Sequence, residues 1–215
     1  MSIQKGNNMR KIWLDCGAWR GTSTKLFDAY HPHANEFEHY LFEPDSKVVE
    51  KYLMPFIQKG YHVIKKAVFI YDGKTNFYVG KHGRGSSLCV EKETGKLDKE
   101  HPVKVETINF AKFIKQSFSQ DDYIICKMNI EGVEYRVLSH LCVTYSNVLT
   151  RINKLYICWH WSKVGVDKER HDKTVDMVER NVDYVYGWNL VENEDNTVDI
   201  ERNRWFLNTF TEKDI

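Results

Sequence analysis

The sequence predicts an α/β fold in which a mainly parallel sheet carries helices on both faces. Strand and helix patterns alternate along the 215 residues, which is typical of parallel strands joined by right-handed crossovers. The segment Tyr123–Met128 is almost wholly apolar, as expected for a central strand covered on both faces. In residues 12–24, an apolar strand runs through Gly17 and Gly21 into a hydroxyl cluster. This order predicts a tight turn from a strand into a helix.

The first half of the chain supplies the predicted strands and helices on one side of that central strand. Pro44 and Asp45 mark a turn, and Pro55 is expected to end a helix. Thr22 or Ser23 is the expected N-cap of the first helix. The predicted elements are the strand Ile12–Leu14, the helix Thr24–Tyr30, the strand His39–Phe42, the helix Lys47–Met54, the strand His62–Phe69 and the extended segment Lys74–Val79, which pairs with or flanks that strand.

The second half continues the alternation and ends in two aromatic-rich strands with no helix between them, which predicts an antiparallel hairpin at one edge. Residues 1–9 are predicted to be a loose leader, and residues 80–102 an irregular loop near the site. All 215 residues fit one domain. The remaining elements are the extended piece Val103–Thr107, the helix Ile108–Ser117, the strand Tyr123–Met128, the helix Gly132–Cys142, the strand Lys154–Cys158, the helix Lys168–Asn181 and the strands Tyr184–Leu190 and Arg204–Phe210.

Composition narrows the classes of partner and compartment. The chain carries 31 basic and 30 acidic residues, and a net charge of +1 argues against a nucleic-acid partner. No apolar run approaches the roughly 20 residues of a membrane span, and the first residues lack the apolar core of a signal peptide. The five cysteines are an odd number without a Cys-x-x-Cys pair, which is typical of reduced thiols in a cytoplasmic protein and gives no thiolate metal site.

Polar residues follow each predicted central strand at its carboxyl end, where ligands bind in open α/β sheets. Asp15 and Gly17 follow the first strand, and Glu43 follows the second. Lys127 to Glu131 end the apolar strand, and His160 follows the next one. We therefore expect these side chains to meet in one crevice.

The glycine turn and the first acid indicate which kind of ligand the crevice binds. Glu43 lies 26 residues after Gly17, where an acid can accept hydrogen bonds from both hydroxyls of a ribose. Nicotinamide cofactors and S-adenosylmethionine both carry such a ribose. Trp19 stands where a dinucleotide turn has its second glycine, and its bulk would obstruct a pyrophosphate. The turn therefore favours a ligand with an amino-acid end.

Several motifs in ordered succession resemble the FkbM-like family of S-adenosylmethionine-dependent methyltransferases. The most diagnostic is Lys127-Met128-Asn129-Ile130-Glu131-Gly132-Val133-Glu134, which is similar to the family pattern K-I-D-x-E-G-x-E. The similarity covers roughly residues 10–165. The other matching segments are Leu14–Thr22, Phe42–Asp45, Lys66–Phe69 with Asp72-Gly73 and Phe77–Val79, Gly85–Leu88 and Val105–Ile108.

The resemblance implies a Rossmann-like class I methyltransferase fold with a seven-stranded sheet. It also implies S-adenosylmethionine-dependent O-methylation, often of a sugar or polyketide hydroxyl, and we expect a sugar or glycan acceptor. By this resemblance Asp15, Gly17, Ala18 and Gly21 line the methionine end of the cofactor, Glu43 holds the ribose, and Ala67 and Val68 flank the adenine. Thr22 and Pro44 are further cofactor-binding residues.

The same resemblance points to residues that carry the chemistry. His160 is the first choice for the base, because imidazole titrates near neutral pH, and Glu131 is the second. Lys127 would hold the acceptor or stabilise a developing alkoxide. Asn129 would orient the acceptor or the amino group of the cofactor.

Two departures from the family pattern leave alternatives open. Asn129 replaces the usual Asp, and Cys158 stands where the family often has an acid, so no metal is expected. The acceptor could be RNA or a small metabolite, or the chain could be a non-catalytic cofactor-binding module. Lys127 and Glu131 could form an ordinary ion pair, and His160 could be a core residue. The charged run from Glu91 to Glu100 is expected to be a solvated loop. The oligomeric state, including a homodimer, stays open.

Overall fold

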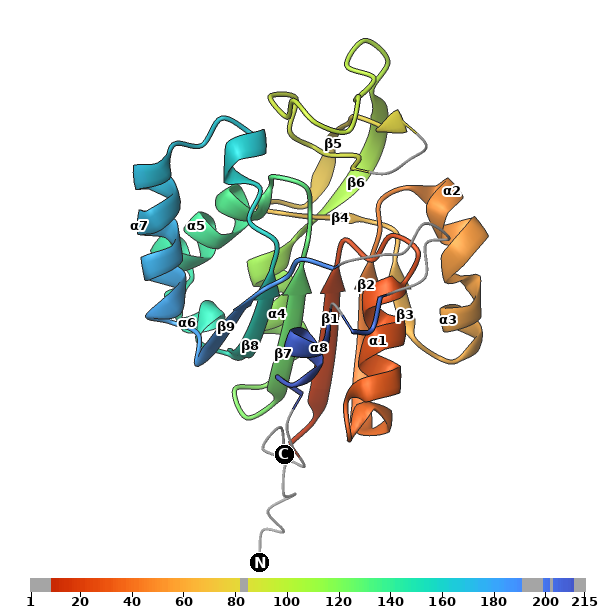
Figure 1. Ribbon diagram of the computed structural model, residues 1–215, viewed down its shortest axis with the longest axis vertical. Coiled ribbons are helices and arrows are strands. Elements are labelled where there is room, and N and C mark those ends of the chain that lie inside the picture. The colour runs from red at the N-terminus through yellow and green to blue at the C-terminus, as the bar shows by residue number, and fades with distance from the viewer. Residues whose placement is uncertain (1–8, 82–84, 191–198, 202, 211–215) are drawn as a thin grey trace, which may run out of the picture.

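The computed structural model describes residues 9–81, 85–190, 199–201 and 203–210. Within them, six parallel strands form the main sheet in the order β3-β2-β1-β7-β8-β9 (Figure 1). The predicted α/β class and parallel sheet are therefore confirmed. The strands are β1 (Lys11–Cys16), β2 (Phe37–Phe42), β3 (His62–Ile64), β7 (Tyr123–Met128), β8 (Ile152–Ile157) and β9 (Tyr184–Gly187).

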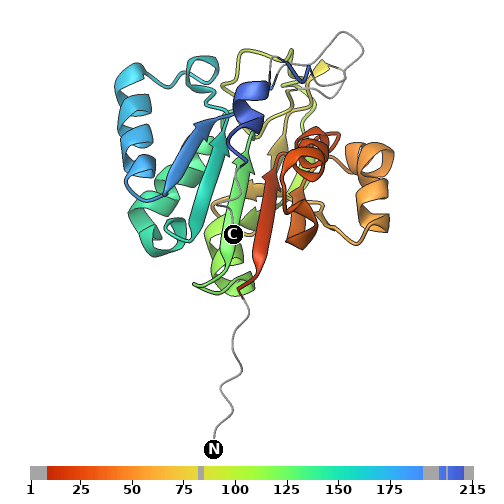
Figure 2. The ribbon, with the colours of Figure 1, turned by 60° about the horizontal axis from the view of Figure 1, so that its bottom comes forward.

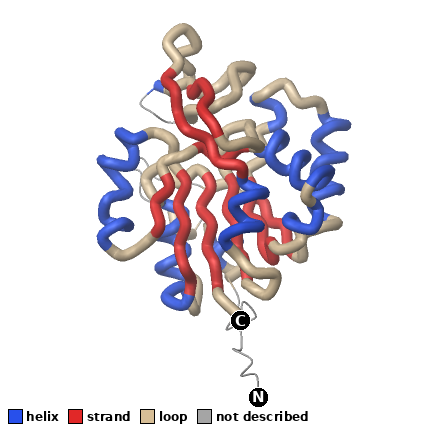
Figure 3. Tube along the Cα trace, turned by 180° about the vertical axis from the view of Figure 1, so that it is seen from behind, coloured by secondary structure: helices blue, strands red, loops and turns tan. Residues whose placement is uncertain are grey.

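Helices cover both faces of this sheet. In Figure 1 α1 and the short α8 lie in front of the strands, and Figure 2 shows the same pair from another angle. In Figure 3, which is seen from behind, α4 crosses the opposite face. The helices are α1 (Thr22–Tyr30), α2 (Ser46–Val48), α3 (Met54–Gln58), α4 (Phe110–Ser117), α5 (Glu134–Thr144), α6 (Ser146–Leu149), α7 (Lys168–Glu179) and α8 (Arg204–Leu207).

The alternation along each central strand explains the two cores. On β1, Ile12 and Leu14 join the cluster under α4 and α5, whereas Trp13 joins the aromatic cluster under α1. Successive side chains of a strand point to opposite faces, so a strand that is covered on both faces must be apolar throughout. All six residues of β1 are buried, including Asp15.

The predicted strand His62–Phe69 is split between two sheets. β3 pairs with β2, whereas β4 (Ala67–Phe69) belongs to a second sheet of three strands in the order β4-β6-β5. This second sheet, with β5 (Gly73–Phe77) and β6 (Val103–Asn109), stands above the carboxyl ends of the main strands (Figure 1). The chain turns after β3, where the Lys66 N–H donates to the Ile64 carbonyl at 2.8 Å.

The predicted C-terminal hairpin and seventh strand are wrong within the described residues. β9 is parallel to β8, and Arg204–Leu207 forms α8 instead of a strand. The Asn203 side chain and N–H both donate to the Asp199 carbonyl, which starts the helical turn. An aromatic-rich pattern of this length does not distinguish a strand from a short helix. The predicted leader, apart from Met9, and residues 191–198, which lie between the two predicted C-terminal strands, are outside the described residues.

Pro55 does not end the second helix, contrary to expectation. Asp45 caps α2 by accepting from the Lys47 N–H, and a π-helical turn over Val49–Leu53 leads directly into α3. Pro55 lies in the first turn of α3, directly after the π-helical turn. The continued helix brings Phe56 against the turn that follows β1. No helix among the described residues is long and apolar enough to cross a membrane.

Candidate active site

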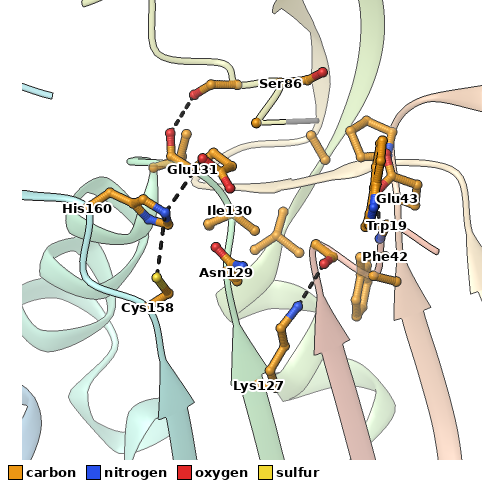
Figure 4. A pocket seen from close by; sticks show the side chains of 18 of the residues that line it. Trp19, Phe42, Glu43, Ser86, Lys127, Asn129, Ile130, Glu131, Cys158 and His160 are labelled. Carbon is orange, nitrogen blue, oxygen red and sulfur yellow. Dashed lines mark hydrogen bonds and ion pairs between the residues drawn. The ribbon is translucent and has the colours of Figure 1, made fainter. Parts of the chain in front are cut away.

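A cavity of about 330 Å³ opens at the carboxyl ends of β1, β2, β7 and β8 (Figure 4), within the ~300–1,000 Å³ range of small-molecule sites. Asp15 and Gly21 do not line it, although both were predicted to line the methionine end. Part of the predicted irregular loop, residues 85–88, does line it. The predicted site residues that line this cavity are Gly17, Ala18, Thr22, Glu43, Pro44, Ala67, Val68, Lys127, Asn129, Glu131 and His160.

Asp15 lies beneath the cavity and organises the turn above it. Its Oδ2 accepts from the hydroxyls of Ser23 at 2.5 Å and Thr24 at 2.8 Å, and its Oδ1 pairs with Lys127 Nζ at 3.0 Å. Lys127 Nζ also donates to the Gly17 carbonyl at 2.7 Å, as Figure 4 shows. Because these groups satisfy one another, Asp15 and Lys127 fix the position of the glycine turn.

Two glycines are required in that turn for different contacts. Gly17 has φ +81°, and a Cβ there would lie 2.0 Å from the Asn129 carbonyl oxygen. Gly21 has φ +72°, and a Cβ there would lie 2.3 Å from the Phe56 ring. Gly21, not Thr22 or Ser23, is the N-cap of α1, so both hydroxyl residues fall inside its first turn. The sequence therefore located the glycines correctly and misassigned the cap.

Glu43 faces the cavity from the end of β2 and is held by backbone donors. Its Oε2 accepts from the Trp19 N–H and its Oε1 from the Asp45 N–H, both at 3.0 Å. Trp19 has φ +51°, a left-handed conformation that aims this N–H at the carboxylate. Burial raises the pKa of Glu43 to about 7 despite the two backbone hydrogen bonds, which lower it.

Asn129 presents an unsatisfied acceptor. Its Oδ1 is buried and has no hydrogen-bond partner among the described residues. A buried polar atom without a partner costs about 1–3 kcal/mol, so the position fits a donor that a ligand supplies. The Asn129 side chain lies between Lys127 and Ile130 in the cavity wall (Figure 4).

Glu134 anchors the turn between β7 and α5, and the sequence analysis gave it no role. It is fully buried, and its two oxygens accept from the N–H groups of Ile130 at 2.8 Å and Gly132 at 2.6 Å. Its Oε1 also lies 3.0 Å from His160 Nδ1. The available signal was its position as the last acid of the motif that begins at Lys127.

His160 is buried against two carboxylates and a thiol. Its Nε2 lies 3.6 Å from Glu131 Oε2 and 3.6 Å from Cys158 Sγ. Burial acts to lower the pKa of His160, but hydrogen bonds to Cys158 and Glu134 and the charges of Glu134 and Glu131 outweigh it. The resulting pKa is about 10, so the imidazole holds a proton at neutral pH.

The loop from Gly85 to Gly95 contacts Glu131 through one hydrogen bond and one ion pair. Ser87 Oγ donates to the Glu131 carbonyl at 2.7 Å, and Lys92 Nζ lies 2.9 Å from Glu131 Oε2. Glu131 itself has φ +58°, a left-handed conformation that few side chains adopt. These contacts stabilise the conformation that points its carboxylate toward His160.

Lys92 is buried, although the charged run that contains it was expected to be a solvated loop. It is 1% exposed, and its Nζ also donates to the Gly85 carbonyl at 2.6 Å. A Cβ at Gly85 or at Gly95 would lie 3.1 Å from this Nζ, so both glycines leave room for the ammonium group. Most of its charged neighbours in the run, such as Glu91 and Lys99, are exposed as predicted.

Among the described residues, no three His, Cys, Asp or Glu side chains are grouped to hold a metal ion. No similar curated protein and no similar solved structure was found. The family model described as "Methyltransferase FkbM domain" matches residues 15–186, which include all the cavity-lining residues from Gly17 to Lys163. The chain therefore belongs to the FkbM family of methyltransferases, whose members use S-adenosylmethionine.

Proposed function

We propose that this chain is an O-methyltransferase that methylates a hydroxyl of a sugar or glycan, with S-adenosylmethionine as cofactor. One observation carries the proposal. The cavity has hydrogen-bonding groups for a ribose and an amino group on one side and the His160–Glu131 pair, whose Nε2 and Oε2 atoms lie 3.6 Å apart, on the other. A cofactor and an acceptor can therefore meet in it.

The residues on the first side fit the cofactor. Glu43 would accept from the two ribose hydroxyls, and Asn129 Oδ1 would accept from the amino group, which would satisfy a buried oxygen. Gly17, Ala18 and Thr22 would border the amino-acid end, where the start of α1 offers N–H groups to a carboxylate. Pro44 would border the ribose, and Ala67 and Val68 would flank the adenine.

The bound cofactor supplies a methyl group on a sulfonium, which is already activated for transfer. The protein must therefore orient the acceptor oxygen and remove its proton. Because the pKa of His160 is about 10, the neutral imidazole that a base needs is scarce at pH 7. We therefore assign proton removal to the Glu131 carboxylate and assign to His160 a hydrogen bond that stabilises the developing alkoxide.

Lys127 takes a different role from the one that the resemblance implies. Its ammonium group pairs with Asp15 and the Gly17 carbonyl, so we propose that it positions the glycine turn instead of binding the acceptor oxygen.

The test is methyl transfer from labelled S-adenosylmethionine to a panel of monosaccharides, RNA and small hydroxylated metabolites. We expect label in a sugar, and turnover that holds from pH 7 to 9 and falls above about 10 as His160 loses its proton. Turnover that instead rises with pH up to about 10 would assign the base to neutral His160. His160→Gln and Glu131→Gln should each lower turnover by about 10²-fold or more.

The same panel decides between the proposal and its alternatives. Label in RNA alone would identify RNA instead of a sugar as the acceptor. The net charge of +1 does not favour that result. Calorimetric binding of S-adenosylhomocysteine without transfer to any acceptor would identify a cofactor-binding module. His62→Gln serves as the matched control, because His62 is exposed on β3 and does not line the cavity.

A further inference from the structure

Cys158, which the proposed reaction does not use, lines the cavity at the end of a chain of polar groups. Its Sγ lies 3.6 Å from His160 Nε2, and His160 Nδ1 lies 3.0 Å from the buried Glu134 carboxylate. Figure 4 shows the thiol and the imidazole pointing toward each other into the cavity. A thiol beside a histidine that a carboxylate orients is the arrangement that makes a cysteine nucleophilic.

The surroundings favour His160 as the holder of the proton in this pair. Glu134 and Glu131 both place negative charge beside the imidazole, and these charges stabilise the imidazolium. Lys92 faces Glu131 from the loop, and no other cation is paired with either carboxylate among the described residues. The pKa of His160, raised to about 10, agrees with this geometry.

The other four cysteines lack this environment, so they form an internal comparison. Cys16 and Cys126 are fully buried in the sheet, where burial raises the pKa of Cys16 well above its usual value. Burial, together with Glu91, raises the pKa of Cys89 to about 11. Cys142 on α5 is half-buried like Cys158, and burial raises its pKa as well.

We infer that Cys158 is a nucleophilic thiol that small soft electrophiles entering the cavity modify covalently. The thiol proton leaves to water, the neighbouring His160 imidazolium stabilises the sulfur charge, and the sulfur electron pair forms the new S–C bond. The leaving group departs with the electrons of the bond that breaks. An adduct at this position would occupy the space beside His160 that we assign to the acceptor. The reaction needs neither cofactor nor acceptor, so it is independent of the proposed function.

The test is the rate at which iodoacetamide alkylates each cysteine of the reduced, folded full-length chain at pH 7, followed by peptide mass spectrometry. We expect Cys158 to react about tenfold faster than Cys142, the matched half-buried thiol. Equal rates at the two thiols would overturn the inference.

His160→Gln removes the imidazolium beside the sulfur and should slow alkylation of Cys158 about tenfold without changing Cys142. The control His62→Gln should change neither rate. If His160→Gln does not fold, the unaltered protein still decides. Below its pKa, an ordinary thiol reacts about tenfold faster for each pH unit, and Cys142 should follow that slope between pH 6 and 8. Cys158 should depend on pH much less, and an identical slope at the two thiols would contradict our assignment.

Discussion

Two acid–base pairs at the carboxyl ends of the central strands differ in their exposure and in how completely neighbouring groups fill their hydrogen bonds. Asp15 and Lys127 lie at 3.0 Å with side chains 0% and 3% exposed, and neighbouring hydroxyl and carbonyl groups complete their hydrogen bonds. Glu131 and His160 lie at 3.6 Å, and the Glu131 side chain is 25% exposed to the cavity. A closed network holds a loop in place, whereas a longer and partly exposed pair can exchange a proton with a ligand.

Both turns contain residues with positive φ. The turn above Asp15 has Gly17, which adopts its positive φ without steric cost, and Trp19 at φ +51°, whose N–H donates to Glu43. The turn that carries Glu131 places a side chain at φ +58° and depends on Ser87, Lys92 and Glu134 to hold it. Strain that neighbouring contacts support is common at functional sites. The comparison therefore assigns stability to the first region and chemistry to the second.

The largest expected effect is in the first region. Asp15→Asn should lower the free energy of unfolding by about 3–5 kcal/mol, because it leaves buried Lys127 without its counter-ion. Asp172→Asn, which breaks an exposed pair with Lys168, is the control and should change stability by less than about 0.5 kcal/mol. Urea unfolding measures both. A small effect at Asp15 would remove the distinction between the two regions.

Lys92→Met tests the support of the second region. The substitution leaves the Gly85 carbonyl and the Glu131 carboxylate without their buried donor, and we expect a loss of about 2–3 kcal/mol in unfolding free energy. Lys99→Met removes the same charge from an exposed position in this loop and should cost less than about 0.5 kcal/mol. If thermal unfolding gives equal values for the two variants, the loop does not hold Glu131 through Lys92.

A smaller effect is expected at Glu43, which belongs to neither pair. Because its pKa is about 7, the ionised form that accepts from hydroxyls becomes dominant above that pH. The affinity for S-adenosylhomocysteine should therefore rise about tenfold from pH 6 to pH 8. Calorimetry should show a weaker affinity without this pH dependence for Glu43→Gln. A wild-type affinity that is flat across this range would place the ribose elsewhere.

The stability of the free protein should change with pH in the opposite sense. The pKa of Glu43 is raised on folding from its ordinary value of 4.5, so its contribution is fully present below pH 4.5. That contribution is lost as the pH rises through about 7. Urea unfolding of wild type and Glu43→Gln should therefore diverge over this interval.

The main features of the site followed from local patterns. The apolar strands, the glycine turn and the polar residues after each strand were enough to predict that Gly17, Glu43, Asn129, Glu131 and His160 line one crevice. This works because parallel strands all end at the same edge of the sheet. Membership of the family was predicted from the same motifs, and the match to the family model confirms it.

Other features required the folded chain. The pattern His62–Phe69 predicts one strand, and only the pairing of β4 with β6 shows that its second part belongs to another sheet. Lys92 is one lysine in a charged run, and its burial depends on the local fold of its loop around Gly85 and Gly95 and on Glu131, which comes from a distant position. The aromatic C-terminal segment forms α8, and Phe210 after this helix packs against Phe27 of α1, an arrangement that its own pattern does not encode.

The sequence by itself determined the fold class, the family and the edge of the sheet where the site lies, because periodicity and turn chemistry are local properties of the chain. The tertiary structure alone decided which charges hold the fold and which face the ligand. Lys127 and Asp15, predicted as site residues, form a buried ion pair with each other, whereas Glu131 and His160 can contact a ligand in the cavity. Burial and partner distance set the behaviour of an ionisable side chain, and both arise only when remote segments pack together.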